Sequence, residues 1–145
     1  MKRIKKISIA VCMLTTLMVI FSACSKQEDK IVGVWCMTSG TDCYPIESGD
    51  VLTMRPDKTF SLATCENTIK GTYYIYDNSI SLKGSNSANI HYSSDAIITD
   101  FSGEFSIVRL EKDEMILSGG ITYNYYFDGH YYYNETSSGD LVCEK

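Results

Sequence analysis

Short alternations of apolar and polar residues run through the chain from Lys30 onward, and no window repeats with the 3.6-residue period of a helix. A period of two places successive side chains on opposite faces of an extended strand, so each stretch predicts a half-buried strand. The expected strands are Ile31–Met37, Val51–Met54, Thr59–Ala63, Thr72–Tyr76, Ser79–Lys83, Phe105–Leu110, Met115–Ser118, Ile121–Phe127 and His130–Glu135, with Ala88–Tyr92 and Ala96–Thr99 as further extended pieces. We therefore expect residues 30–145 to form an all-β domain, an antiparallel meander of about eight to ten strands that closes into a small barrel.

Tight-turn sequences separate these strands. Asp128-Gly129 is the strongest hairpin signal, because a type I′ turn needs residues that accept positive φ. Asp77-Asn78 predicts a second two-residue turn for the same reason. In Arg55–Lys58, Pro56 presets φ and the Asp57 side chain can bond its own backbone. Each of these turns joins strands that are neighbours in the sequence.

The N-terminal segment is expected to be a signal peptide. Four cations lie within the first six residues, an apolar run covers Ile7–Phe21, and Ser22-Ala23-Cys24 follows. A transmembrane anchor is the alternative, but Ile7–Ala23 only reaches the short end of the roughly 17–25 residues that a spanning helix needs. We therefore assign residues 1–23 to a cleaved signal.

Residues Phe21-Ser22-Ala23-Cys24 resemble the lipobox of bacterial lipoproteins. The resemblance implies that Cys24 is acylated on its thiol and on the new amino group, and several acyl chains hold a protein firmly in a membrane. Polar residues 24–29 are expected to form a flexible tether. Ser25 stands where an Asp would retain a lipoprotein in the inner membrane, so the resemblance implies the outer membrane, and Glu28-Asp29 resembles a surface-export signal.

Gly33-Val34-Trp35 resembles the Gly-x-Trp motif of lipocalins, as found in the lipocalin-like domains of small bacterial lipoproteins. Residues 51–60, 71–75, 80–82, 105–110 and 115–117 follow in that family's order. The resemblance implies a barrel floor at Gly33 and Trp35, where Arg109 could stack on Trp35. Lys58 replaces a usual Gly, so a left-handed residue there would carry a strain of about 1–2 kcal/mol. The mature chain is shorter than a full lipocalin, and its own side chains could fill so small a barrel.

Four cysteines remain after the signal and Cys24, and an exported protein enters an oxidising compartment. Three pairings are possible. We favour Cys43–Cys65, which brackets a hairpin, and Cys36–Cys143, which barrel closure would bring to neighbouring strands. Without a Cys-x-x-Cys pair, we expect no metal and no other cofactor.

Charge and motifs argue against two function classes. The chain has 13 Lys+Arg against 18 Asp+Glu and a pI near 4.9, whereas a nucleic-acid partner needs a basic face. Its two histidines, His91 and His130, lie in no catalytic motif, and Glu111, Asp113 and Glu114 are expected to be a solvated turn cluster. We therefore do not expect an enzyme.

Six of the eleven tyrosines lie between Tyr123 and Tyr133. A two-residue turn at Asp128-Gly129 would oppose Tyr126 to Tyr131, Tyr125 to Tyr132 and Asn124 to Tyr133. One face would then be core, and the other would be a possible binding surface made of Asn124, Tyr126, Tyr131 and Tyr133, suited to sugar rings or a protein partner. The alternative is that the aromatic pairs simply stabilise the hairpin.

These features favour an outer-membrane or cell-surface lipoprotein whose non-catalytic lipocalin-like domain binds a small apolar or carbohydrate ligand. The alternative is an interaction module of the envelope, such as a subunit of a surface assembly or an inhibitor of a hydrolase. A purely structural envelope lipoprotein is the third class.

Replacing Cys24 tests the anchor. Cys24→Ala removes the thiol that would be acylated, so the precursor should stay unprocessed and take up no labelled palmitate in cells. Continued labelling of this variant would contradict the assignment.

Overall fold

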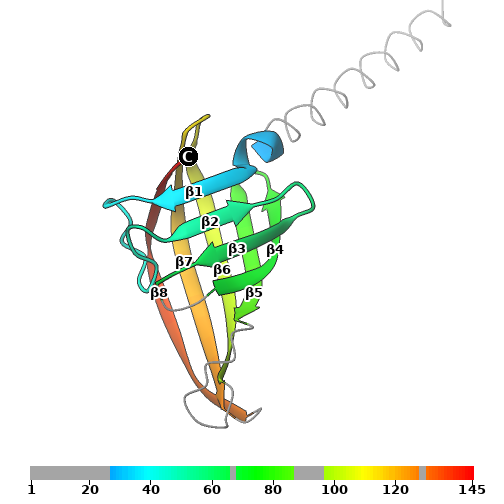
Figure 1. Cartoon of the computed structure of the whole chain (residues 1–145), viewed down its shortest axis with the longest axis vertical. Helices are drawn as coiled ribbons and strands as arrows, with labels where there is room; N and C mark the ends of the chain where they lie inside the picture. Colours follow the sequence, from blue (N-terminus) through cyan, green and yellow to red (C-terminus); the bar gives the residue numbers. More distant parts are fainter. Residues whose placement is uncertain (1–26, 66–67, 87–96, 128–129) are drawn as a thin grey trace, which may run out of the picture.

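The structure, a computed structural model, describes residues 27–65, 68–86, 97–127 and 130–145. Eight antiparallel strands follow one another around a closed barrel in sequence order (Figure 1). They are β1 (Gly33–Met37), β2 (Val51–Met54), β3 (Thr59–Ala63), β4 (Thr68–Tyr76), β5 (Ser79–Asn86), β6 (Ile97–Leu110), β7 (Glu114–Phe127) and β8 (His130–Glu144). The expected all-β meander barrel is confirmed.

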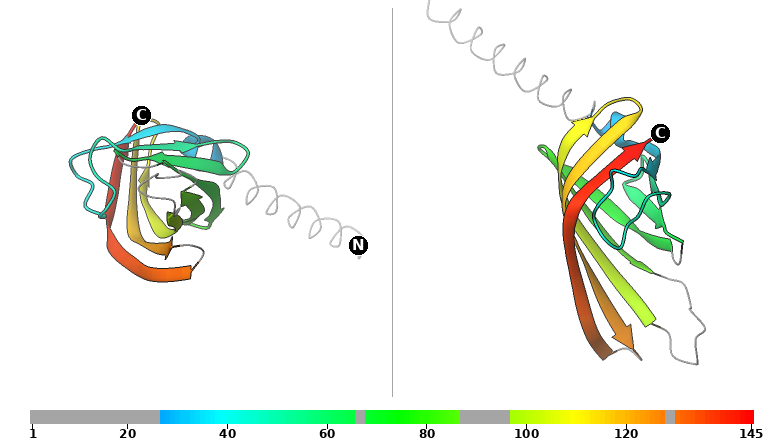
Figure 2. Two further views of the ribbon diagram at one scale, coloured as in Figure 1. Left: turned by 60° about the horizontal axis from the view of Figure 1, so that its bottom comes forward. Right: turned by 90° about the vertical axis from the view of Figure 1, so that its left-hand side faces the viewer.

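The last three strands are much longer than the first three. β6, β7 and β8 have 14, 14 and 15 residues, whereas β1, β2 and β3 have 5, 4 and 5. The right-hand view of Figure 2 shows these long strands continuing beyond the short ones. The sequence predicts separate strands before and after Gly119-Gly120, but β7 runs through both glycines without a break. At Gly119 the backbone of β6 lies so close that a Cβ would overlap the carbonyl oxygen of Glu104.

The two ends of the barrel differ. At one end, which we call the cap end, lie the turns 55–58, 77–78 and 111–113 and the C-terminal Lys145. Residues 27–31 form a helical turn at this end, in the upper part of Figure 1, and we call it the cap turn. Ile31 therefore belongs to the cap turn and not to the first strand, and the expected tether is helical at residues 27–29. At the opposite, far end lie the end of β7 and the start of β8, whereas the β1–β2 loop runs beside Asp140 and Val142 of β8.

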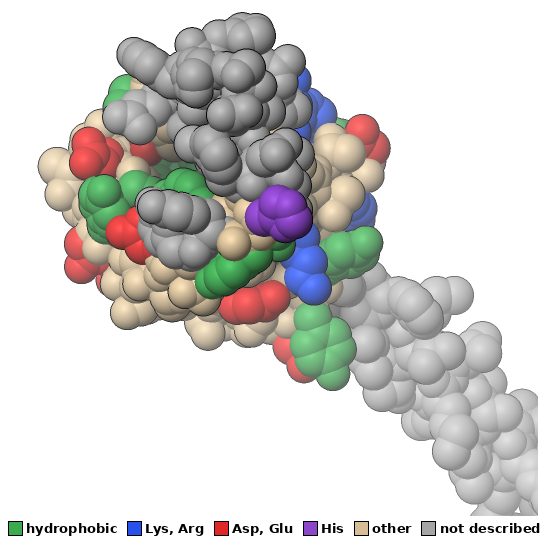
Figure 3. Space-filling model, turned by 90° about the horizontal axis from the view of Figure 1, so that it is seen from below, with side chains coloured by type: hydrophobic (Ala, Val, Ile, Leu, Met, Phe, Trp, Pro, Cys, Tyr) green, Lys and Arg blue, Asp and Glu red, His purple; other side chains and the backbone are tan. Residues whose placement is uncertain are grey.

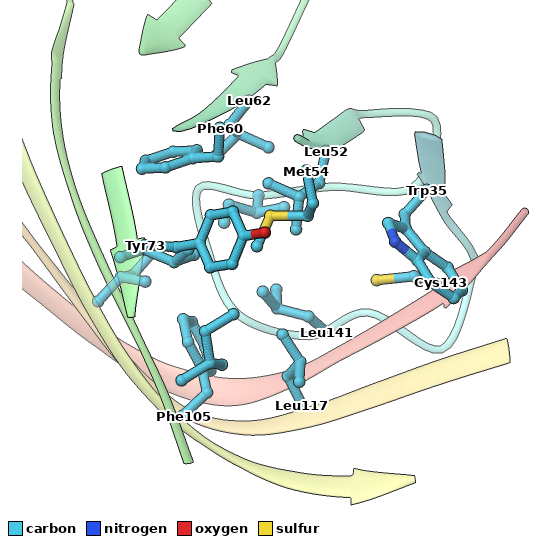
Figure 4. Packing of buried hydrophobic residues seen from close by; sticks show 14 of the residues in the cluster. Trp35, Leu52, Met54, Phe60, Leu62, Tyr73, Phe105, Leu117, Leu141 and Cys143 are labelled. Atoms are coloured by element: carbon cyan, nitrogen blue, oxygen red, sulfur yellow. The ribbon is translucent and has the colours of Figure 1, made fainter. Parts of the chain in front are cut away.

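Apolar side chains fill the barrel toward the cap end (Figure 4). Trp35 and Tyr73 are the largest fully buried side chains. Each has its polar atom bonded to the backbone: the Trp35 Nε1 donates to the Ile31 carbonyl at 2.7 Å, and the Tyr73 hydroxyl donates to the Arg55 carbonyl at 2.7 Å. Buried donors that keep such partners avoid a desolvation penalty of about 1–3 kcal/mol each.

Gly33 and Lys145 shape the site of Trp35. The Lys145 ammonium lies 4.4 Å from the centre of the Trp35 ring, a cation–π contact. Gly33 has φ +149°, which favours glycine at this position of the motif, and a Cβ there would lie 2.7 Å from Cε of Lys145 and would displace that side chain from the Trp35 ring. The expected stacking of Arg109 on Trp35 is wrong, because Arg109 pairs with Glu114 at 2.8 Å on the surface.

Two turns have the backbone conformation that the sequence indicates. Lys58 has φ +66°, so the strained residue expected in place of glycine is present, and Asp77 has φ +50°. Asp57 accepts hydrogen bonds from the amide and the hydroxyl of Thr59, at 3.0 and 2.6 Å. These bonds, the hydroxyl's foremost, lower the pKa of Asp57 below its ordinary value. The Asp128-Gly129 turn and residues 87–96 lie outside the described residues.

The structure contains none of the expected disulfides, and all four described cysteines are free thiols. Cys36 is opposite Glu144, whereas Cys143 is opposite Met37, so one side chain is exposed and the other lies inside the barrel. Sequence reasoning placed the two cysteines on neighbouring strands correctly but could not give the one-residue register offset that separates their faces. Cys43 is likewise buried while Cys65 is exposed, and burial raises the pKa of Cys143 to about 12.

Trp35 should dominate the stability of the barrel. Trp35→Ala removes a fully buried ring and leaves a cavity, so the free energy of unfolding should fall by about 3–5 kcal/mol in chemical denaturation. Val34→Ala is the matched control, because its neighbour Val34 is 53% exposed and should change stability little. Equal losses in both variants would contradict this account of the core.

Candidate functional site

The tyrosine hairpin is built from the far parts of β7 and β8. Phe127 is opposite His130 and Tyr126 is opposite Tyr131, as expected. A β-bulge then shifts the register by one residue, so Tyr125 is opposite Tyr133 and Asn124 is opposite Asn134. The expected pairs of Tyr125 with Tyr132 and of Asn124 with Tyr133 are therefore wrong.

The bulge changes which tyrosines share a face. Along β7 the odd-numbered Ile121 and Tyr123 are buried, so the even-numbered Asn124 and Tyr126 belong to the outer face. Tyr131 lies opposite Tyr126, whereas Tyr133 is opposite Tyr125 in the register. Of the expected surface, Asn124, Tyr126 and Tyr131 have described side chains, whereas the side chain of Tyr133 lies outside the described part of the structure.

Tyr126 and Tyr131 form an edge-to-face pair on the outer face. Their ring centres are 6.0 Å apart with an interplanar angle of 79°, and Tyr131 is 57% exposed. Partial desolvation and the neighbouring Asp100, whose carboxylate bonds the Tyr126 hydroxyl, raise the pKa of Tyr126 above its ordinary value. Asp100 therefore belongs to the same group of residues, although the extended piece expected from the sequence ends at Thr99.

Hydroxyl, amide and carboxylate groups continue from this pair across the sheet. One row of register partners crosses four strands, from Ser85 through Asp100 and Asn124 to Asn134. In the next row Thr122 and Thr136 are 3.3 Å apart through their hydroxyls. We call this surface the outer face, and define it as Ser85, Asp100, Thr122, Asn124, Tyr126, Tyr131, Asn134 and Thr136.

Charge on the far end is scattered. Figure 3 views the molecule from that end, and its acidic and basic side chains form no continuous patch of one sign. His130 is exposed there at the start of β8, and His91 lies outside the described residues. The other candidate charges, Glu111 and Asp113, are exposed in the β6–β7 turn at the cap end.

The inside of the barrel offers no comparable surface near Trp35, because packed side chains occupy it (Figure 4). Toward the far end Tyr123 is 4% exposed, and burial above all raises its pKa beyond the ordinary tyrosine range. The buried polar side chains Asp50 and Asn86 also lie away from water. A hollow of about 320 Å³ lies on the outside at the cap end, lined by Gln27, Lys30, Asn78 and residues 107–110.

Other site types find no support in the part of the chain that the structure describes. No group of three or more His, Cys, Asp or Glu side chains within it could hold a metal ion. Its helical segment is too short to cross a membrane, and no other described helix could do so. Cys24, the expected lipidation site, lies outside the described residues.

Comparison with known proteins leaves the family open. No family model, no curated protein and no solved structure matches the chain. The outer face is thus the candidate site on its own geometry.

The contact between Tyr126 and Asp100 gives a direct test of that geometry. Asp100→Asn removes the negative charge that opposes ionisation of the phenol, so the pKa of Tyr126 should fall toward its ordinary value. NMR titration with ¹³C-labelled tyrosine would measure the shift, with Tyr126→Phe to assign the resonance. An unchanged pKa would show that the two groups are not in contact.

Proposed function

We propose that this protein is a lipid-anchored envelope protein whose barrel is a non-catalytic scaffold, and whose outer face binds a carbohydrate. The observation that carries the proposal is the Tyr126–Tyr131 pair, which stands on an outward face beside Asp100 and Asn124. The lipobox resemblance at Cys24 supports the anchor.

The chemistry of the outer face fits sugar rings. A sugar has an apolar face of C–H groups and a rim of hydroxyls, so it needs an aromatic surface with acceptors and donors beside it. Tyr126 and Tyr131 supply rings, the Asp100 carboxylate supplies an acceptor, and Asn124 and Asn134 supply both donors and acceptors. Among the eight residues of the outer face the charged side chain is the Asp100 carboxylate, so a neutral sugar suits the surface around the tyrosine pair better than an acidic one; the nearest cation in the same row is Lys70, the register partner of Ser85 on β4.

A small apolar ligand inside the barrel is supported less. Such ligands need an apolar cavity of about 300–1,000 Å³. The side chains of Trp35, Tyr73 and Phe60 occupy the interior toward the cap end. Because side chains fill this part of the interior, the outside of the barrel is the better candidate for ligand binding.

A protein partner is the second candidate, and the edge of β8 favours it. Within the described strands, β8 pairs with β1 only at Cys36↔Glu144 and Met37↔Cys143, and the Asp42 backbone adds a hydrogen bond to the Asp140 carbonyl. The described part of β8 ahead of Gly139 is therefore a sheet edge on that side, where a partner strand could add main-chain hydrogen bonds. Such a partner would be a subunit of a surface assembly or a hydrolase.

Removing both rings tests carbohydrate binding. Tyr126→Ser combined with Tyr131→Ser should weaken binding to an immobilised panel of neutral oligosaccharides by about tenfold or more, since each stacked ring contributes roughly 0.5–1.5 kcal/mol. The melting temperature should fall only slightly, because the lost cross-strand pair is on the surface.

Tyr74→Ser is the matched control, because Tyr74 is 63% exposed on β4, outside the outer face. This variant should bind as the original protein does. A large loss of stability in the double variant with binding unchanged would show that the tyrosines only hold the hairpin together.

A further inference from the structure

The cap turn is fastened to three separate parts of the cap end. The Gln27 amide donates to Asn78 Oδ1 in the β4–β5 turn at 3.3 Å, and Glu28 pairs with Lys58 in the β2–β3 turn at 2.7 Å. The Lys30 ammonium donates to the Leu110 carbonyl at the end of β6 at 3.4 Å. These contacts span the chain from residue 58 to residue 110, so the cap turn crosses the end of the barrel.

The end of the cap turn is held from inside and from the C-terminus. Ile31 is fully buried, and its carbonyl accepts the bond from the Trp35 indole. The Lys145 ammonium that covers the Trp35 ring also donates to the Lys30 carbonyl at 3.1 Å. Single surface ion pairs contribute little, but a buried side chain with several bonds around it fixes a segment. The chain therefore leaves the barrel at a defined place.

Cys24 is only three residues from Gln27. Three residues of fully extended chain reach at most about 11 Å between Cα atoms. Whatever conformation these residues have, a lipid on Cys24 keeps the start of the cap turn at Gln27 within about that distance of the anchored residue.

Exposed apolar side chains surround the same end. Six large hydrophobic residues are exposed in the described chain, and four of them, Val34, Tyr74, Tyr76 and Val108, lie on the cap-end halves of β1, β4 and β6. We call these four the apolar girdle. Tyr76 is 78% exposed beside the β4–β5 turn, and Val108 lines the same hollow as Gln27. Tyrosine with aliphatic neighbours is the composition that favours the membrane interface.

We propose that the cap end is a membrane-contacting surface that rests in the headgroup layer and directs the outer face away from the bilayer. This inference rests on the proposed anchor at Cys24. The occupant of the surface is the bilayer that holds the chain's own lipid. Strand β8 runs from the far end back to Glu144, so its start stands on the order of 35 Å from the membrane at ordinary strand rise and tilt.

Lengthening the tether separates membrane contact from folding. The acylated full chain is placed in vesicles of phosphatidylethanolamine and phosphatidylglycerol, and amide hydrogen exchange is compared with a variant carrying about ten Gly/Ser residues between Ser25 and Lys26. The insertion leaves the cap turn in place but frees the barrel from the surface. Turns 55–58 and 77–78 should exchange about threefold or more slowly in the original chain, and residues 121–127 and 130–135 should exchange alike in both.

Side-chain variants test the girdle. Tyr76→Ser with Val108→Ser should bring exchange at the two turns close to that of the insertion variant, with no change in melting temperature. Tyr131→Ser, which removes an exposed tyrosine at the far end, should leave the turns protected.

Equal exchange at the turns in the original and insertion chains would overturn the proposal, and so would slowed exchange of the tyrosine hairpin on vesicles. Failure of the anchor itself has a different signature. The intact mass would then lack acyl groups, and the protein would not float with the vesicles.

Discussion

The seam between β1 and β8 is the constraint on which this barrel depends, because the sheet must close there. Two residue pairs join the strands, and the loop after β1 extends the contact when the Thr38 and Asp42 amides donate to the Val142 and Asp140 carbonyls. Side-chain contacts strengthen this short pairing of β1 with β8. Trp35 on β1 lies under Lys145 at the end of β8, and the Cys143 thiol is 3.3 Å from the Met37 sulfur. Gly33 belongs to this seam because it leaves room for Lys145.

Closing the barrel near the cap end has a consequence for the other end. The short strands β1, β2 and β3 pair with one another, with residues 68–72 of β4 and with the last residues of β8, so the far parts of β6, β7 and β8 continue beyond them as a three-stranded sheet. Such a sheet has an inner and an outer surface, and few of the contacts that fill the barrel reach its tip. The tip is thereby free to carry polar and aromatic groups that a core would not accept. In the proposed function, the core near the cap end stabilises the barrel and the opposite ends of the same strands bind the ligand.

The fold could be predicted from the sequence because period-two patterning and turn residues act locally. Val51–Met54 and Thr59–Ala63 have the predicted bounds, and the strained φ of Lys58 follows from its place in the turn. The predicted length of the last strand was wrong, because strand pairing outweighed the local sequence signal. β8 continues beyond Glu135 to Glu144, through a stretch that contains Ser and Gly, since β7 supplies a pairing partner along it. Patterning likewise could not show that residues 27–29 are helical, since their partners Asn78 and Lys58 are distant in sequence.

The sequence predicts that the candidate site is aromatic, but it does not predict which residues make up the site. Its aromatic content can be read from the sequence, whereas Asp100 reaches Tyr126 only through the register of β6 and β7. The predicted Cys36–Cys143 disulfide is absent for the same reason. The sequence predicts that the two cysteines lie on neighbouring strands, but it does not give the one-residue register offset between them. Register is a tertiary property, because the pairing of whole strands fixes it.

One extra residue in β8 decides what the outer face contains. Without the bulge beside Tyr126, strict alternation from an outward Tyr131 would turn the buried Leu141 and Cys143 outward. The bulge lets β8 present Tyr131 outward at the tip and still place Leu141 in the core near the seam. The bulge shifts the inward and outward alternation by one residue between the two parts of β8, so that one part can supply core residues and the other can supply residues of the outer face. It lies where the barrel sheet continues into the tyrosine hairpin.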